Sequence, residues 1–403
     1  MIPWWEPFQL YVMAYPVALC AITMATALIH VLRRETVTEP AADEMPSVAI
    51  LVPACNEERV LEETLHALLA LDWPLLEIHV LSDGSTDGTV EIARTFAPER
   101  VQVAAHAVNR GKSAVLQDAL AALTTDLVMI VDADTRLEPS AVGELAACFV
   151  HPDVGGATAN VRVAGARSLL MRLQQMEYAT IIGLVKRANG FWGGLFTVSG
   201  AAACFRVAAV RAVGGFQSRS ATEDIELSWR LQRAGWRLVY APRAKVFIEV
   251  PARLRALWRQ RRRWASGLTE VLRLHGALWR GPHANARVLA PFVAEAVCSI
   301  VWSVLLVASI ATFVVQWALT GTSAALAPGF WQWQIFTVAM FLAQSFTAWL
   351  IDRHYAREPA WLLALALIYP LYFLVFVLPA NLAGWTIGLF TQQAQRWQRT
   401  ERA

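Results

Sequence analysis

The pattern of hydrophobic and polar positions changes twice along the chain. Residues 8–32 are apolar and almost uncharged, a run long enough to cross a bilayer as one helix. Short apolar runs then alternate with segments of helical periodicity, and long apolar segments return near the carboxyl end. We therefore divide the chain into six parts: an N-terminal transmembrane anchor (1–34), a linker (35–46), a globular domain (47–250), amphipathic interfacial helices (251–285), transmembrane helices (286–392) and a basic tail (393–403).

Within the globular domain, the pattern predicts parallel strands joined by helices. Short apolar runs with polar flanks are typical of strands covered on both faces. Helical periodicity fills the intervals between them, so a doubly wound α/β sheet is the simplest fold. The expected strands are 48–52, 78–81, 101–105 and 127–131, and the expected helices are 60–71, 89–96, 113–122, 168–188 and 225–234.

The composition agrees with a protein that is partly in lipid. Hydrophobic residues make up 56% of the 403 residues, and the mean hydropathy of +0.40 is too high for an ordinary soluble protein. The net charge of +3 gives no indication of nucleic-acid binding. The five cysteines lack the Cys-x-x-Cys spacing of zinc sites, so neither zinc nor a disulfide framework is predicted.

Basic residues near the apolar segments predict the topology. Arg33 and Arg34 follow the first apolar run instead of preceding it, which favours a retained anchor over a signal peptide. The positive-inside rule places this pair, and with it the globular domain, in the cytoplasm. Trp4 and Trp5 suit the opposite membrane interface. We expect a multi-pass membrane protein with its globular domain in the cytoplasm.

Three apolar segments follow near the carboxyl end. Residues 289–315 and 333–351 are expected to cross the membrane and return the chain to the cytoplasm, where a basic turn over 352–357 fits. Residues 360–390 are too long for one upright helix and contain Pro370 and Pro379. We expect two short passes or a re-entrant hairpin there, with a single kinked span as the alternative.

Two carboxylates follow the last predicted strand of the globular domain. Asp132 and Asp134 come directly after the apolar run 127–131, and ligands of open α/β sheets gather at the carboxyl ends of strands. Carboxylate oxygens suit Mg²⁺ or Mn²⁺, which keep positions open for phosphate oxygens. The pair therefore indicates a seat for a metal and a diphosphate, although a solvated turn has the same sequence pattern.

Polar residues also follow the other predicted strands. Asn56 and Glu57 follow the first, Asp83 follows the second and Lys112 follows the third. One crevice can receive all of them, with Asp83 accepting hydrogen bonds from a nucleoside and Lys112 meeting a phosphate. An ordinary turn with a helix cap and a solvated lysine are the alternatives.

Two further motifs lie in the second half of the domain. Thr222, Glu223 and Asp224 precede a predicted helix, so Asp224 is either a catalytic base or a carboxylate favoured by the helix dipole. Ser199 and Gly200 end a glycine-rich aromatic loop, which suits an acceptor sugar or, alternatively, core packing beside a turn.

Residues 251–280 carry many arginines interleaved with apolar residues at helical spacing. This pattern predicts a pair of amphipathic helices at the membrane surface.

Together the motifs resemble those of the family 2 inverting glycosyltransferases, and they occur in the family order. The motifs are Asp83, Asp132-x-Asp134, Thr222-Glu223-Asp224 and Gln260-x-x-Arg263-Trp264, the last of which marks processive polysaccharide synthases. The resemblance implies a GT-A-like nucleotide-sugar-binding domain fused to transmembrane helices.

The resemblance also implies roles for individual residues. Asp224 is the expected base, and Asp134 with Asp132 is expected to hold Mg²⁺ or Mn²⁺. The expected donor-binding residues are Asn56, Glu57, Asp83, Lys112, Asp132, Gln260 and Arg263, and the expected acceptor-binding residues are Ser199, Gly200, Thr222, Glu223 and Trp264.

Within the processive enzymes, the strings at 181–187, 196–200, 222–229 and 260–267 look most like those of bacterial biofilm poly-β-1,6-N-acetylglucosamine synthases. That likeness implies UDP-N-acetylglucosamine as donor, a growing exported polysaccharide, contact with membrane lipid, a small two-span accessory membrane subunit and cyclic di-GMP regulation through their complex. The chain departs from that family in having one convincing N-terminal span where two are common.

Three alternatives remain open from the sequence. A hyaluronan, chitin or cellulose type of synthase keeps every motif. A non-processive enzyme acting on a membrane lipid lacks a reason for the Gln260-x-x-Arg263-Trp264 motif. A transporter or membrane scaffold has no need of Asp132, Asp134 and Asp224 at strand and helix ends.

Overall fold

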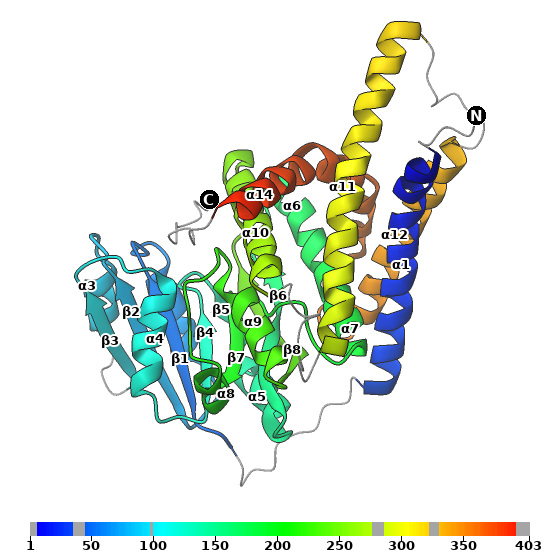
Figure 1. The fold of residues 1–403 in the computed structure, drawn as a ribbon. Coiled ribbons are helices and arrows are strands. Elements are labelled where there is room, and N and C mark those ends of the chain that lie inside the picture. The colour runs from blue at the N-terminus through cyan, green and yellow to red at the C-terminus, as the bar shows by residue number, and fades with distance from the viewer. Residues whose placement is uncertain (1–5, 35–44, 97–99, 276–285, 322–329, 392–403) are drawn as a thin grey trace.

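The computed structural model describes residues 6–34, 45–96, 100–275, 286–321 and 330–391. An α/β domain lies beside a group of long helices, α1, α11 and α12 (Figure 1). The predicted tail (393–403), most of the linker (35–44) and the tryptophans at positions 4 and 5 lie outside the described residues.

The α/β domain is built on one eight-stranded sheet with the strand order β3-β2-β1-β4-β7-β6-β8-β5. Its first half is parallel: β1 pairs with β2 and β4, and β2 pairs with β3. This confirms the four predicted strands. The strands are β1 Val48–Ala54, β2 Leu76–Asp83, β3 Val101–His106, β4 Leu127–Val131, β5 Arg136–Leu137, β6 Val154–Val163, β7 Ala202–Arg206 and β8 Arg237–Ile248.

The second half of the sheet departs from the predicted doubly wound pattern. Strand β7 runs antiparallel to both β4 and β6. Its first residue, Ala202, pairs with Val131 at the end of β4, so the chain re-enters the sheet at the carboxyl end of β4. The sheet is therefore mixed, and the residues just before β7 lie next to those just after β4.

Both faces of the sheet are covered, as the apolar runs predicted. In β1, Val48, Ile50 and Val52 belong to one hydrophobic core, whereas Ala49 and Leu51 belong to the other. Successive side chains of a strand point to opposite faces, so one run of five apolar residues supplies both cores. The helices of the domain are α2 Leu61–Leu69, α3 Thr89–Thr95, α4 Lys112–Ala122, α5 Ala141–Ala146, α8 Val207–Ala212 and α9 Glu223–Arg233, and η2 Ala147–Val150 is a 3-10 turn.

The helix predicted over 168–188 is present, with a π-helical stretch in its middle. It consists of α6 Leu169–Met176, η3 Glu177–Ile182 and α7 Gly183–Phe191. The predicted pair of amphipathic helices is a single helix, α10 Leu254–His275, because no proline lies within it and its glycine, Gly267, is held inside the helix against the Thr222 side chain. Residues 276–285 lie outside the described part. Helix α10 packs along α14.

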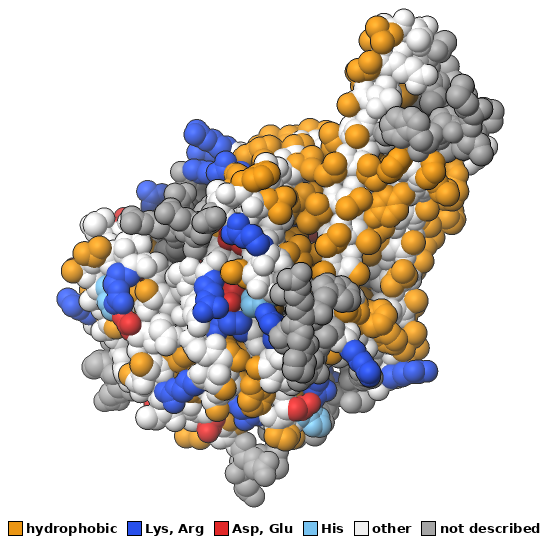
Figure 2. All heavy atoms as spheres, in the orientation of Figure 1, with side chains coloured by type: hydrophobic (Ala, Val, Ile, Leu, Met, Phe, Trp, Pro, Cys, Tyr) orange, Lys and Arg blue, Asp and Glu red, His pale blue; other side chains and the backbone are white. Residues whose placement is uncertain are grey.

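Among the described residues, four helical segments are long and apolar enough to cross a membrane: Pro7–Arg33, Arg287–Thr320, Gln332–Asp352 and Tyr369–Phe390. The first three belong to α1 Glu6–Arg34, α11 Ala286–Thr320 and α12 Phe330–Asp352. Hydrophobic side chains cover the visible surface of these long helices (Figure 2). The carboxyl ends of α1 and α12 and the amino end of α11 lie at the same end of the group (Figure 1).

The last apolar segment differs from the two short passes or re-entrant hairpin that we expected, and its single candidate span, Tyr369–Phe390, is nearer to the alternative of one kinked span. After the 3-10 helix η6 Ala360–Leu367, the chain is helical without a break through α13 Tyr369–Tyr372, the π stretch η7 Phe373–Val377 and α14 Leu378–Phe390. Pro370 lies in the first turn of α13, where a missing N–H is tolerated. Pro379 lies inside the continuous helix, directly after the π stretch η7, a local irregularity of the kind that accommodates a proline. In the view of Figure 1, this segment runs across α11 and not alongside it.

Candidate active site

A cavity of about 550 Å³ opens at the carboxyl ends of β1 and β4 and reaches the long helices. The Asp132-x-Asp134 pair follows β4, and the motifs that begin at Thr222 and Gln260 lie at the start of α9 and on α10. Helix α7 forms one wall of the cavity. Most of the predicted site residues line this one space: Glu57, Lys112, Asp132, Asp134, Ser199, Gly200, Thr222, Glu223, Asp224, Gln260, Arg263 and Trp264.

Lys112 links two of the predicted motifs. Its buried Nζ lies 2.7 Å from Asp132 Oδ1 and 3.2 Å from Glu223 Oε1. Burial alone would lower the pKa of Lys112, but the charges of Asp132 and Glu223 outweigh it and raise the pKa. Lys112 is therefore a fixed cation between these carboxylates, and the alternative of a solvated lysine is wrong.

Asp83 and Asn56 are not among the residues that line the cavity. The Asp83 carboxylate is only 1% exposed and accepts hydrogen bonds from the backbone N–H groups of Arg110 and Gly111, at 2.7 and 2.8 Å. Asn56 Oδ1 accepts from the backbone N–H of Thr86 at 2.8 Å. Both side chains hold loops beside the cavity, and their predicted contacts with a donor stay predictions.

Asp224 lies at the cavity wall in the first turn of α9. Burial and the neighbouring Glu223 raise its pKa to about 6, although Lys112 and Arg263 act in the opposite direction. A carboxylate with that pKa is ionised at neutral pH and accepts a proton more readily than an ordinary aspartate. Asp224 Oδ1 also accepts the Ile225 N–H at 2.9 Å, so it stabilises the helix start as well.

Lys186 is a cavity residue that sequence reasoning missed. It is buried on α7, and its Nζ donates to Thr158 Oγ1 at 3.1 Å. The same Thr158 hydroxyl accepts the backbone N–H of Ser199 at 2.8 Å. Burial lowers the pKa of Lys186 to about 7, partly offset by Asp224. Its position in an apolar helical pattern did not predict that its amine would point into the cavity.

The three residues of the Gln260-x-x-Arg263-Trp264 motif face the cavity, whereas Arg261 between them is buried in the core. Gln260, Arg263 and Trp264 line the cavity, and Arg263 Nη1 donates to the Ala221 carbonyl at 3.2 Å. Arg261 makes a buried bidentate ion pair with Glu177, with both N–O distances at 2.8 Å. Its guanidinium also lies 4.7 Å from the Trp264 ring centroid, so a cation–π contact covers one face of that ring.

The membrane-type helices complete the cavity. Glu295 and Ser299 of α11 and Trp385 of α14 are among its lining residues, and Ser299 Oγ lies 2.6 Å from the hydroxyl of Tyr15 on α1. These residues were missed because apolar segments predict lipid contact and give no indication of which side chains turn toward a neighbouring domain. The space therefore runs from the sheet to the helix group.

The residues present suit a metal that shares its ligands with a substrate. Among the described residues, no three His, Cys, Asp or Glu side chains are grouped as a metal site of their own. Asp132 and Asp134 supply carboxylates in the cavity, and Mg²⁺ commonly binds through one or two carboxylates with phosphate oxygens completing its shell. This donor set fits a divalent cation that binds together with a diphosphate.

Several characterised proteins are similar to this chain. The poly-beta-1,6-N-acetyl-D-glucosamine synthase of Staphylococcus epidermidis is 34% identical over 241 residues, covering 59% of this chain and 58% of that protein. The synthase of the same name from Staphylococcus aureus strain COL is 36% identical over 232 residues, covering 57% and 56%. The chain thus spans little more than half the length of these curated relatives.

A solved structure is also similar. The mannosyltransferase PcManGT from Pyrobaculum calidifontis, in complex with GDP-Man and Mn²⁺, matches with a TM-score of 0.60 and 22% identity, covering 85% of this chain and 98% of that one. The likeness shows a common GT-A-like fold. Residues 46–267, more than half of the chain, match the family described as Glycosyltransferase like family 2, and the chain therefore belongs to that family.

Proposed function

We propose that this protein is a processive inverting glycosyltransferase that polymerises N-acetylglucosamine from UDP-N-acetylglucosamine into a β-1,6-linked polysaccharide. The observation that carries the proposal is the lining of one cavity by Asp224, the Lys112–Asp132 ion pair and Arg263. A base and a set of cations in one space are what transfer from a nucleotide sugar requires. The names of the 34–36% identical relatives support the choice of sugar and linkage.

The chemistry follows from the charges around the cavity. The acceptor hydroxyl attacks the anomeric carbon of the donor, its proton passes to the Asp224 carboxylate, and the bond from carbon to the diphosphate oxygen breaks. The electron pair of that bond leaves with UDP. Lys112 and Arg263 hold positive charge in the cavity, which stabilises the negative charge that develops on the leaving group. Attack opposite the leaving group inverts the anomeric centre.

We propose that Asp134 and Asp132 hold Mg²⁺ or Mn²⁺ together with the diphosphate. Such an ion supplies positive charge to the leaving group. The Mn²⁺ and GDP-Man in the mannosyltransferase of similar fold support this assignment. Lys112 already neutralises one oxygen of Asp132, so that carboxylate has less negative charge to offer the ion.

The continuity of the cavity with the helix group supports a link between synthesis and export. Trp264 and Trp385 line it and offer aromatic faces on which sugar rings stack. We propose a bacterial inner-membrane enzyme with its α/β domain in the cytoplasm, since Arg33 and Arg34 end the first span. A two-span accessory subunit and cyclic di-GMP regulation through it stay predictions.

The proposal is tested by incubating the purified full chain with single UDP-sugars and measuring released UDP and product. UDP-N-acetylglucosamine should give a polymer that enzymes specific for β-1,6-linked N-acetylglucosamine degrade. Turnover with another UDP-sugar alone would favour a different polysaccharide synthase. Single additions to a lipid would favour a non-processive enzyme, and no UDP release with any sugar would contradict a transferase.

A further inference from the structure

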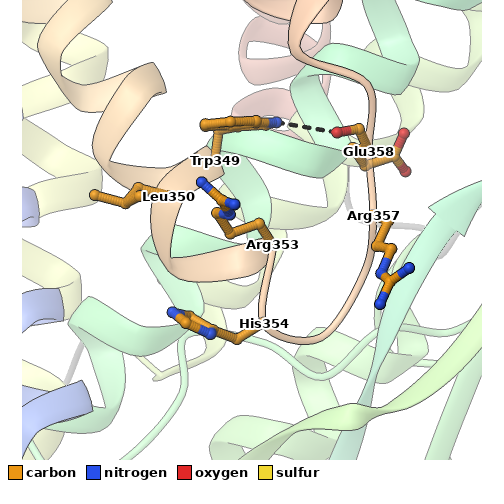
Figure 3. Close-up of a pocket in the computed structure, with 6 residues that line it drawn as sticks. All are labelled: Trp349, Leu350, Arg353, His354, Arg357 and Glu358. Atoms are coloured by element: carbon orange, nitrogen blue, oxygen red, sulfur yellow. Dashed lines mark hydrogen bonds between the residues drawn. The ribbon is translucent and has the colours of Figure 1, made fainter.

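A second cavity, of about 540 Å³, lies at the end of α12, away from the active-site cavity. Its lining residues are Trp349, Leu350, Arg353, His354, Arg357 and Glu358. They come from the last turns of α12 and from the turn that follows, and Arg353 and Arg357 stand on the two arms of that turn (Figure 3). The cavity thus joins the end of a candidate membrane span to a basic turn.

The basic side chains of this cavity are not neutralised locally. Arg353, His354 and Arg357 are exposed, and within the described part of the chain no carboxylate forms an ion pair with any of them. The guanidinium of Arg353 lies 5.3 Å from the Trp349 ring centroid. The helix dipole favours cations at this end of α12, but it leaves their hydrogen-bond donors open to an anion.

The two acidic residues beside the turn, Asp352 and the cavity residue Glu358, are engaged by side chains of the α/β domain. Asp352 pairs with Arg162 of β6 and lies 3.5 Å from Arg187 of α7. Glu358 accepts from Gln175 at 3.0 Å through its carboxylate, and its backbone carbonyl accepts the Trp349 indole N–H at 3.1 Å. These contacts fix both arms of the turn to the α/β domain, so the cavity is formed before any ligand binds.

An apolar surface continues from the cavity along α12. Leu350, in the cavity wall, is 43% exposed, and Phe346, one turn earlier, is 52% exposed. Both belong to a helix that is long and apolar enough to cross a membrane, so these side chains suit lipid chains. A ligand that joins a phosphate to acyl chains can contact both the basic turn and the apolar surface of α12. A soluble anion can contact only the basic turn.

We propose that this cavity binds the anionic headgroup of a membrane phospholipid, with the phosphate between Arg353 and Arg357 and an acyl chain along Leu350 and Phe346. Arginine binds phosphate oxygens through paired N–H donors, and tryptophan is favoured at the level of lipid headgroups. The site is independent of the sugar chemistry and stands even where the proposed function fails.

The test measures lipid binding to the delipidated full chain by native mass spectrometry, with phosphatidylglycerol as the probe. Phosphatidylcholine with the same acyl chains and inorganic phosphate are the comparison ligands. We expect a phosphatidylglycerol adduct that is on the order of tenfold weaker in Arg353→Gln/Arg357→Gln. Arg353→Lys/Arg357→Lys, which keeps the charge, should retain most of the binding and shows that the turn still folds.

The matched control is Arg94→Gln/Arg100→Gln, which removes the same charge from the far edge of the α/β domain near α3 and β3. It should bind phosphatidylglycerol as the unchanged protein does. Equal binding by all variants, equal binding of phosphatidylcholine, or binding of inorganic phosphate as tight as that of the lipid would each overturn the proposal.

Discussion

Gly200 leaves the space into which the Asp224 carboxylate fits. A Cβ atom at position 200 would stand 2.9 Å from Asp224 Oδ2 and 3.4 Å from its Cγ, closer than side chains ordinarily approach. The loop before β7 and the first turn of α9 therefore meet without a side chain between them. The position of the proposed base depends on this glycine.

Gly200→Ala should displace the Asp224 carboxylate and lower kcat. A shift of about 1 Å in a reacting group costs on the order of 10²-fold in rate, while UDP binding should be unchanged because Lys112 and Arg263 keep their places. Steady-state kinetics and UDP titration measure the two effects. Gly143→Ala is the control, since its Cβ would stand at an ordinary 3.6 Å from the Trp73 ring. A normal kcat in Gly200→Ala would show that the position of Asp224 does not depend on this glycine.

Asp224→Asn should remove the base and keep the donor site. We expect transfer to fall by a factor on the order of 10² or more, with UDP-sugar binding within about twofold of normal. Release of UDP and equilibrium binding are the measurements. Asp72→Asn, an exposed carboxylate outside the cavity, should behave as the unchanged protein. Retained turnover would leave Asp224 with a helix-capping role alone.

The pH dependence of turnover should report the ionisation of Asp224. Its pKa is raised to about 6, and the base works in its deprotonated form. The kcat/KM should therefore be level above pH 6 and fall about tenfold for each unit below it. Residual activity of Asp224→Asn should lack this acidic limb, whereas a limb that survives unchanged in that variant belongs to another group.

The first half of the sheet and its polar residues could be predicted because each strand end is marked in the sequence by an apolar run that stops at polar residues. A buried run that stops at Asp132 and Asp134 places both carboxylates at one edge, and the same reasoning found Lys112. The antiparallel β7 could not be predicted in this way. Its direction is determined by where the loop before Ala202 re-enters the sheet, a tertiary relationship that apolar periodicity does not encode.

The same limit explains the missed cavity residues. Lys186 lies within a largely apolar helical segment. Its amine contacts Thr158 because α7 packs next to β6 in the folded domain, which the local sequence does not indicate. Glu295 of α11 faces the cavity because the helix group lies beside the domain. Asp83 has a structural role that its strand-end position did not reveal, since its carboxylate accepts hydrogen bonds from two backbone N–H groups.

Asp134→Ala should remove the dependence of turnover on divalent cations, with activity near background. The change also has a readout in binding: Mg²⁺ should strengthen UDP binding to the unchanged protein and have no effect on the variant. Asp132 is a poorer choice, because its loss would strand Lys112 beside Glu223 alone. Mg²⁺-dependent UDP binding that persists in Asp134→Ala would remove this residue from the metal site.

Trp264→Ala should shorten the polymer before it harms donor binding. The ring lines the cavity and is backed on one face by Arg261 at 4.7 Å, so its other face can stack on a sugar of the growing chain. Loss of such a platform is worth on the order of 1 to 2 kcal/mol, enough for about tenfold weaker acceptor retention. Product length and UDP affinity are the measurements.

The control for that change is Trp258→Ala, a tryptophan on the same helix that is 37% exposed and not among the lining residues of the cavity. If Trp264 acts only by packing against Arg261 on the same helix, its loss should lower the melting temperature without altering the length of the product. Trp264→Phe keeps an aromatic face and should restore most of the length. Polymer of normal length from a folded Trp264→Ala variant would show that the acceptor is held elsewhere, with Trp385 on α14 the next ring of the cavity to change.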